Sequence, residues 1–354
     1  MKIPTVYSRF DDLPAGCETL FEAAGRSSFF HALPWYRNLV SHGLPEGKNL
    51  RIYAVDGESG VEGVLPMMHD GKKRRLESLS NYYSSLFMPV VCPDPEAALE
   101  RLADAISRDE MRWDMVDLHP MDADSPIFSG FIDALKRAGM IVLPYFCFGN
   151  WYLDVGGRSY SEYFDTLPSK LKNTLKRKGK QLHASGETRL EIVTEPDAVD
   201  AAIAAYEKVY NSSWKVPEPH PGFMPGLIRT CAENGWLRLG TVHVGEEPVA
   251  AQVWMVKDGI ASIYKLAYDE RFSKLSAGSV LTAKLMEHVI DVDKVREVDY
   301  LTGDDDYKKD WMSARRERWG LAAYNRRTFR GFVEGVLNFG WGKYKEVRHG
   351  RSAS

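Results

Sequence analysis

A run of three strands, a helix and a further strand in the second half of the sequence constrains the fold most. Strand-like runs cover residues 236–244, 249–257 and 260–268, and the turn signals GEEP and DG separate them. A turn of small residues, SAGS, then precedes an apolar-periodic helix and a strand over 296–302. A helix near 307–316 and a strand over 321–329 complete the order β-β-β-α-β-α-β, which predicts an α/β (α+β) fold with a mixed, mostly antiparallel sheet.

The SAGS turn is a candidate anion site. Small residues let an anion approach the backbone, and the first N–H groups of a helix are unpaired and carry the positive end of its dipole. Ser276 is the predicted N-cap. An ordinary capped helix packed on a sheet explains the same residues, so both interpretations stay open. The predicted buried face of the helix consists of Val280, Leu281, Leu285, Val289 and Ile290.

The charged segment VDYLTGDDDYKKDW, residues 298–311, follows the helix. Asp299 lies inside an apolar strand, where a carboxylate needs a partner, either structural or catalytic. The aspartates 304–306 are candidates for proton transfer, but acids at a helix start also favour the dipole and act as N-caps.

The first half repeats the order of elements. Strands are predicted at 50–55, 61–69, 75–79, 113–118 and 140–146, with helices at 95–107 and 126–137. VDL at 116–118 falls where VDY falls at 298–300, which indicates a duplicated unit. CPDP replaces the small-residue turn, and Asp94 would repel phosphate, so this copy is expected to bind no cofactor and to shape the acceptor site. Together with the GGRS linker at 156–159, the repeat predicts two domains, 1–155 and 156–354.

Composition limits the function classes. A chain of 354 residues exceeds the usual single-core size, and a net charge of −3 argues against a surface that binds DNA throughout. The four cysteines are far apart and lack clustered histidines, which predicts reduced thiols and neither zinc nor disulfides. No signal peptide or membrane-spanning segment is indicated, so a cytoplasmic protein is expected.

Basic residues concentrate in two segments. The run KLKNTLKRKGKQL, residues 170–182, is predicted to be a solvated helix with Leu171, Leu175 and Leu182 inside, in preference to a helix that seeks phosphate or RNA. From Lys308 onward, twelve Lys or Arg stand against four Asp or Glu. That excess could attract an anionic acceptor or a membrane surface.

Four segments together resemble the GNAT superfamily of acyl-CoA N-acyltransferases, in its two-domain branch of FemAB-type and CelD-like proteins. They are SSWK at 212–215, EEPVAAQVW at 246–254, the SAG turn with its helix, and VDYLTGDDDYKKDW at 298–311. The resemblance covers most of 159–330 and the first half only loosely. One departure concerns the phosphate loop, which in the superfamily has Arg or Gln and Gly-x-Gly or Gly-x-Ala, and of which only Gly278 remains.

The resemblance implies a set of site residues around an acyl-CoA co-substrate, acetyl-CoA or a longer one. Backbone N–H groups at Leu266, Ala267 and Tyr268 would polarise the thioester carbonyl, and the turn Ser276, Ala277, Gly278 and Ser279 would hold the pyrophosphate. Tyr307 would be the acid and Asp304 the base or amine-orienting group, with Asp299 a further candidate. Trp214, Lys215 and Lys308 would contact the acceptor, although Trp214 could equally be a core residue and Lys308 an ordinary exposed lysine.

The predicted activity is therefore acyl transfer from CoA to an amine, with an amino sugar of an envelope or exported polysaccharide, lipid- or nucleotide-linked, as the family-level acceptor. FemAB-type transfer from aminoacyl-tRNA to peptidoglycan precursors ranks second, because the chain lacks the long coiled-coil insertion of those relatives. A sensor that binds ligand without catalysis is the third hypothesis. A small-molecule acceptor is expected, with no DNA and peripheral membrane contact as an option.

Overall fold

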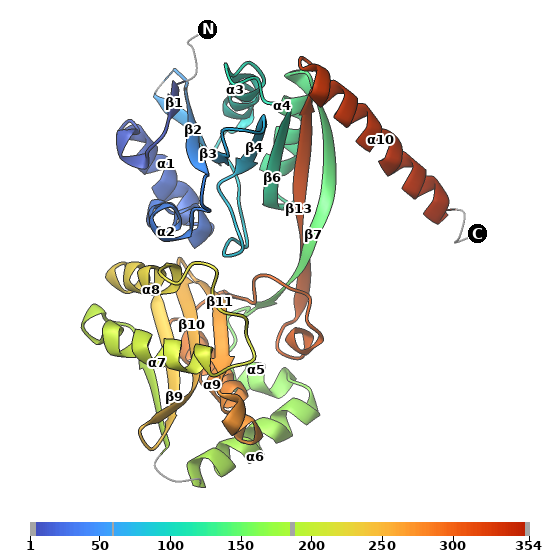
Figure 1. Cartoon of the computed structure of the whole chain (residues 1–354). Helices are drawn as coiled ribbons and strands as arrows, with labels where there is room; N and C mark the ends of the chain where they lie inside the picture. Colours follow the sequence, from blue (N-terminus) through green and yellow to red (C-terminus); the bar gives the residue numbers. More distant parts are fainter. Residues whose placement is uncertain (1–4, 59, 185–187, 351–354) are drawn as a thin grey trace. The chain divides into compact units, whose positions relative to one another are not determined.

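The computed structural model describes residues 5–58, 60–184 and 188–350. It has a mixed α/β fold, as predicted, and its residues group into two compact units (Figure 1). Unit 1 contains residues 5–37, 44–148 and 317–350, and unit 2 contains residues 38–43 and 149–316, apart from the undescribed positions.

Unit 1 is a sheet in the order β1-β2-β3-β4-β6-β13-β7, with the short β5 paired to β3. Helices α3 and α4 pack against its apolar core, which contains Tyr53, Leu65, Leu102, Trp113 and Phe131. The strands are β1 Thr5–Tyr7, β2 Asn49–Asp56, β3 Val61–His69, β4 Arg75–Ser78, β5 Val90–Val91, β6 Met115–Asp122, the first part of β7 Met140–Asp154 and most of β13 Ala314–Asn325. The helices are α1 Gly16–Gly25, the start of α2 Leu33–Gly43, α3 Glu96–Ser107, α4 Pro126–Arg137 and α10 Phe329–Gly350.

Unit 2 is a sheet in the order β7-β12-β11-β10-β9-β8. Its core surrounds Trp254, the residues Leu281 and Leu285 of the apolar face of α9, and Val289 just after that helix. The strands are β8 Thr188–Val193, β9 Leu237–Val244, β10 Glu247–Lys257, β11 Ile260–Tyr268 and β12 Glu297–Asp299. The helices are α5 Tyr160–Thr166, α6 Ser169–Ala184, α7 Val199–Asn211, α8 Phe223–Glu233 and α9 Ala277–Glu287, with a 3-10 turn Glu270–Leu275 before α9 and a π-helical turn His288–Val292 after it.

The three-strand meander is confirmed, because β9, β10 and β11 pair antiparallel in sequence order. The similar order of elements in the first half is also present, from β2 to β7. The basic run lies on α6, where Leu175 and Leu182 are buried and Leu171 is partly buried, as expected of a solvated amphipathic helix.

The helix predicted near 307–316 is wrong. A 3-10 turn covers only Asp306–Asp310, and β13 begins at Ala314, seven residues before the predicted strand start. The strand forms because residues 318–324 pair with β6, a long-range contact that local periodicity cannot reveal. As a result, residues 317–350 group with unit 1, while the division into domains 1–155 and 156–354 stays a prediction.

Across the described ranges, no helix is both long and apolar enough to span a bilayer.

Candidate active site

The parallel strands β11 and β12 are paired along only part of their length. Their register joins Ile260 to Glu297 and Ser262 to Asp299, and β12 ends there. β11 continues to Tyr268 while paired to β10 on its other side. The β12-facing edge of residues 266–268 therefore lies beyond the described β11–β12 ladder.

Backbone direction follows from the β10 ladder. Asp269 N donates to Val249 O at 2.9 Å, so the N–H of Asp269 points to the β10 side. Alternate residues of a strand direct their hydrogen-bonding groups to opposite edges. The N–H groups of Leu266 and Tyr268 consequently face the edge on the β12 side, and that of Ala267 faces β10. At two of the three positions predicted to bind the thioester carbonyl, the backbone N–H group therefore points to the edge beyond the β11–β12 ladder, where such a carbonyl could accept its hydrogen bond.

The first turn of α9 is attached to the sheet by Gln252 of β10. This side chain is 1% exposed, and its Nε2 donates to Gly278 O and to Thr282 Oγ1, each at 2.8 Å. Its Oε1 accepts from Trp254 Nε1 at 2.9 Å. Every polar group of the amide is used, so Gln252 fixes the turn relative to β10 and β11.

Ser276 occupies the N-cap position of α9, but its predicted capping bond is absent from the described structure. The residue has φ 52° and ψ 35°, the left-handed region, in which its side chain accepts no capping bond. Because a left-handed cap aims the side chain away from the helix N–H groups, Ala277, Gly278 and Ser279 lack this partner. A Cβ at Gly278 would lie 3.5 Å from Tyr268, an ordinary contact, so glycine here is not sterically required.

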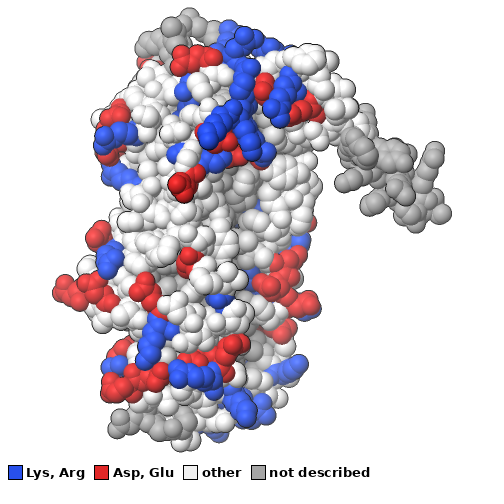
Figure 2. Space-filling model, viewed as in Figure 1, with Lys and Arg blue, Asp and Glu red and all other residues white. Residues whose placement is uncertain are grey.

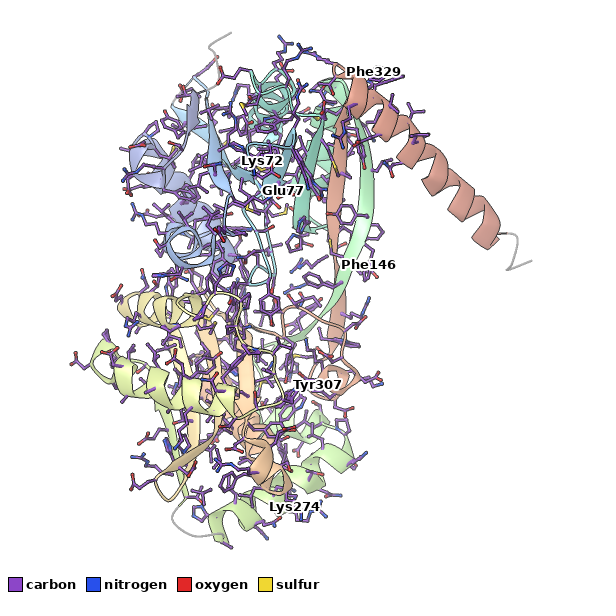
Figure 3. The ribbon with its side chains drawn as sticks, in the orientation of Figure 1. Lys72, Glu77, Phe146, Lys274, Tyr307 and Phe329 are labelled. Carbon is purple, nitrogen blue, oxygen red and sulfur yellow. The ribbon has the colours of Figure 1, made fainter. Side chains whose placement is uncertain are left out.

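Two lysines flank this turn. Lys274 is the penultimate residue of the 3-10 turn before α9 and is exposed (Figure 3). Lys178 of α6 donates from Nζ to the carbonyl oxygen of Lys274. The basic run on α6 therefore supplies one cation next to the predicted phosphate turn, and this residue was not predicted.

Tyr307 lies on the 3-10 turn after β12 and is 46% exposed. Its ring meets the buried Tyr300 edge to face at 5.7 Å, and the two side chains are hydrogen-bonded. Burial of the hydroxyl and the nearby Asp305 carboxylate raise the pKa of Tyr307 to about 12. Tyr307 therefore keeps its proton at neutral pH, as a general acid must.

Asp304 is held in a three-residue cluster. Arg315 binds it in bidentate fashion, from Nε at 3.0 Å and Nη2 at 2.7 Å, and Trp151 Nε1 donates at 2.8 Å. The Arg315 hydrogen bonds lower the pKa of Asp304, so its carboxylate is a weakened base. A Cβ at Gly149 would lie 2.5 Å from Arg315 Nη2 and 2.6 Å from Asp304 Oδ2, so only glycine fits beside this pair without a shift.

Asp299 has hydrogen-bonding partners, as predicted for a carboxylate inside an apolar strand. Its carboxylate accepts from Arg316 Nη2 and Asn150 Nδ2, each at 2.6 Å, and from Leu301 N at 2.7 Å. Arg316 also binds Glu297 at 2.7 Å. With 6% exposure, Asp299 braces β12 against β7, which is the structural one of its two predicted alternatives.

Lys308 is 4% exposed, which differs from the exposed lysine of the sequence prediction. Its Nζ donates to Thr302 O at 2.6 Å and Gly303 O at 3.2 Å, and lies 3.4 Å from Asp305 Oδ2. Three contacts use the three donors of an ammonium group. Lys308 thus shapes the 302–305 loop, and the predicted acceptor contact would have to replace one of these bonds.

Trp214 is 48% exposed and does not belong to the core, so that alternative is excluded. Its ring centroid lies 4.6 Å from that of Tyr268, the last residue of β11. Lys215 Nζ lies 5.4 Å from the Trp214 ring. Burial lowers the pKa of Lys215, with Lys265 adding to the effect. An aromatic surface and a partly desolvated cation therefore lie at the end of β11.

Sequence reasoning missed the supporting residues. Two of them, Gln252 in AAQVW and Asn150 in FGNWY, are polar side chains next to apolar or small neighbours, a signal that the sequence does carry. The missed residues are Gly149, Asn150, Trp151, Lys178, Gln252, Arg315 and Arg316. Within the described part of the chain, no group of three or more His, Cys, Asp or Glu side chains is arranged to hold a metal ion.

Comparison with known proteins matches part of the chain to one family. Residues 169–309 match the family described as an acetyltransferase (GNAT) domain. The sequence has no significant match among curated proteins.

Solved structures resemble the whole chain at low identity. The crystal structure of FemX has 11% identity and a TM-score of 0.64, covering 87% of this chain and 96% of that one. The C-terminal domain of a putative lysylphosphatidylglycerol synthetase from Agrobacterium fabrum has 12% identity and a TM-score of 0.53, with 85% and 90% covered. A tandem GNAT protein from the clavulanic acid biosynthesis pathway has 12% identity and a TM-score of 0.51, with 91% and 97% covered. These likenesses show that the chain shares the fold of these three structures.

Proposed function

We propose that this chain, in which residues 169–309 form a GNAT acetyltransferase domain, transfers an acyl group from acyl-CoA to an amine. The observation that carries the proposal is the end of β11. There, N–H groups of Leu266 and Tyr268 face the edge beyond the β12 ladder, and α9 begins nine residues after Tyr268.

The donor would bind along these two elements. A thioester carbonyl placed beside β11 accepts a hydrogen bond from a fixed backbone N–H, and one such donor is worth about 3 kcal/mol in the transition state. The diphosphate of CoA would meet the N–H groups of Ala277, Gly278 and Ser279, with Lys274 and Lys178 adding positive charge. The lysines replace the charge that the missing loop arginine supplies in the resembling family.

Tyr307 is assigned as the donor to the leaving group. Its pKa near 12 keeps the hydroxyl protonated at neutral pH, so it is available to donate a hydrogen bond to the departing thiolate and to stabilise its charge. Asp304 is proposed to orient the acceptor amine instead of deprotonating it, because Arg315 and Trp151 hold its carboxylate and reduce its basicity. The amine would therefore enter in its neutral form and release its proton to water once the C–N bond has formed and the C–S bond has broken. Asp299 is proposed to act only through the position of β12.

The acceptor is proposed to be an amino sugar that carries a negative charge, part of an envelope or exported polysaccharide. The exposed face of Trp214 suits a sugar ring, and Lys215 beside it suits a carboxylate or phosphate. The Trp214 ring lies 4.6 Å from that of Tyr268 at an interplanar angle of 42°, and this contact with the last residue of β11 supports an acceptor surface near the proposed carbonyl site.

A second candidate is aminoacyl transfer from tRNA. The likeness to FemX supports this candidate. A second ground is the basic run of α6, where four exposed residues are suited to phosphate groups: Lys170, Lys176, Arg177 and Lys180. It ranks second because Lys178 directs its charge to the α9 turn, where a compact diphosphate fits.

A paired transfer experiment separates the candidates. The protein is incubated with acetyl-CoA or with aminoacyl-tRNA, each with a panel of amino sugars and peptidoglycan precursors, and products are identified by mass spectrometry. Acetylated amino sugar supports the proposal. Product only from aminoacyl-tRNA selects the second candidate, and acetyl-CoA binding without any product selects the ligand sensor.

A further inference from the structure

Helix α10 packs on unit 1 through glycines. A Cβ at Gly331 would lie 2.5 Å from the carbonyl oxygens of Asp114 and Asn325, and one at Gly335 would lie 2.9 Å from Ile141 and Tyr324. These glycines are i and i+4, so they share one helix face. Glycines therefore form the face of α10 that contacts the sheet, and the large apolar residues of the helix lie on a different face.

Those large residues form a continuous exposed stripe. They recur at i, i+3, i+4, i+7 and i+8, the spacing of one helix face. Their exposed fractions range from 37% to 88%. The stripe comprises Phe329, Phe332, Val333, Val336 and Leu337. Figures 1 and 3 show α10 leaving the strands of unit 1 soon after Phe329.

The charge around this stripe is positive. Residues 326–350 contain six Lys or Arg and two Glu, although the chain as a whole has a net charge of −3. Elsewhere, on the face shown in Figure 2, acidic and basic side chains lie among one another. An apolar helix face within a segment that has an excess of Lys and Arg fits the interface of an anionic bilayer, where apolar burial and attraction to lipid phosphates add together.

Pairing with a second copy is less favourable. In a two-fold antiparallel pair of α10 helices, Arg326, Arg327 and Arg330 of one copy would lie near the end of the other, where the sequence places Lys343, Lys345 and Arg348. Both ends of such a pair would bring like charges together. Anionic lipid headgroups avoid this repulsion.

We propose that α10 is an interfacial helix that binds unit 1 to membranes containing anionic phospholipid. The helix lies in the plane of the interface with the stripe in the acyl boundary. The inference is independent of the proposed acyl transfer, because an inactive protein would still bind.

The test is sedimentation of the full chain with vesicles of phosphatidylcholine, alone or mixed with phosphatidylglycerol. Binding is expected to the mixed vesicles only, and to weaken as salt rises. Val336→Asp should reduce the partition coefficient about tenfold or more, because it removes apolar burial and adds an anion. Asn338→Asp is the matched control: it adds the same charge to an exposed residue two positions further, outside the stripe, and should change binding by about threefold or less.

Circular dichroism and melting temperature establish that both variants fold. Equal binding to both vesicle types, or equal loss in both variants, would overturn the proposal. So would sedimentation velocity showing a lipid-free dimer that Val336→Asp dissociates, since the stripe would then serve a second copy.

Discussion

At the scale of single residues, the surroundings of Tyr307 suit a hydrogen-bond donor, whereas those of Asp304 suit a group that positions the amine. Tyr307 is part-exposed and holds its proton, while Asp304 is fixed by a bidentate arginine. The distinction arises from neighbours far apart in sequence, Trp151 and Arg315, and it leads to separate expectations for each residue.

Replacing Tyr307 with Phe should lower kcat by about 10² to 10⁴ with little change in KM for acyl-CoA, because only the proton donor is removed. Since the pKa of Tyr307 is about 12, its acid form is lost only as pH rises through that value. The pH–rate profile should therefore show no alkaline decline from this residue below about pH 11. Tyr82→Phe, at an exposed tyrosine of unit 1, is the control, and equal rates for wild type and Tyr307→Phe would refute the assignment.

Replacing Gly149 with Ala should impair acceptor use by disturbing the Asp304–Arg315 pair. The new Cβ would meet both side chains within 2.6 Å, so the pair must shift. We expect KM for the amine to rise about tenfold, as for a misplaced positioning group. Gly179→Ala in α6, where a Cβ meets no atom within 4 Å, should leave kinetics unchanged and stabilise the protein by about 0.5–1 kcal/mol. Unchanged kinetics in both variants would remove Asp304 from the site.

At the scale of elements, the sequence predicted the presence of helices and strands better than it predicted where each one begins and ends. Turn signals and alternation were sufficient for β9, β10 and β11, and helical periodicity was sufficient for α3, α4 and α9. The helix prediction for 307–316 was wrong because its charged residues match a helix locally. The strand β13 is instead stabilised by pairing with β6, about 200 residues earlier.

The candidate site shows the same division. Asp299 could be identified from the sequence because a carboxylate in an apolar strand needs a hydrogen-bonding partner. Its partners are Arg316 and Asn150, and their identity depends on how the strands pair. Gln252 carried a similar signal in PVAAQVWM and was overlooked. Such residues are found only once the sheet order is known.

Replacing Gln252 with Leu should detach the first turn of α9. It leaves Trp254 Nε1 without its acceptor, a cost of about 1–3 kcal/mol, and removes the donor to Gly278 O and Thr282 Oγ1, which keep only their hydrogen bond to each other. Urea unfolding should show the loss, and KM for acyl-CoA should rise because the turn is no longer fixed. Asn173→Leu, at an exposed position of α6, is the control. A stability loss without any change in KM would mean that the turn does not bind the donor.

At the scale of the whole molecule, acid should destabilise the fold through buried histidines. Burial lowers the pKa of His31 from 6.5 to about 4, and burial also lowers the pKa of His69 and His243. Between these pH values the unfolded chain binds a proton that folded His31 does not, so the free energy of unfolding falls as pH decreases from 6.5 to 4. The His31 contribution is about 3 kcal/mol at most.

Urea unfolding from pH 7 to pH 4.5 measures this slope, which His31→Gln should reduce. An identical slope in wild type and His31→Gln would show that His31 is protonated in the folded protein.

The central claim is that the turn opening α9 binds the diphosphate of acyl-CoA. Isothermal titration calorimetry of acetyl-CoA tests it with two variants that each change the net charge by −1: Ser279→Glu in the first turn and Lys284→Gln further along α9. A glutamate in the first turn favours the helix dipole, so Ser279→Glu should fold while repelling phosphate. The account predicts that wild type and Lys284→Gln bind acetyl-CoA and that Ser279→Glu binds at least about tenfold more weakly. Equal affinity of all three proteins, or absence of binding by wild type, would contradict it.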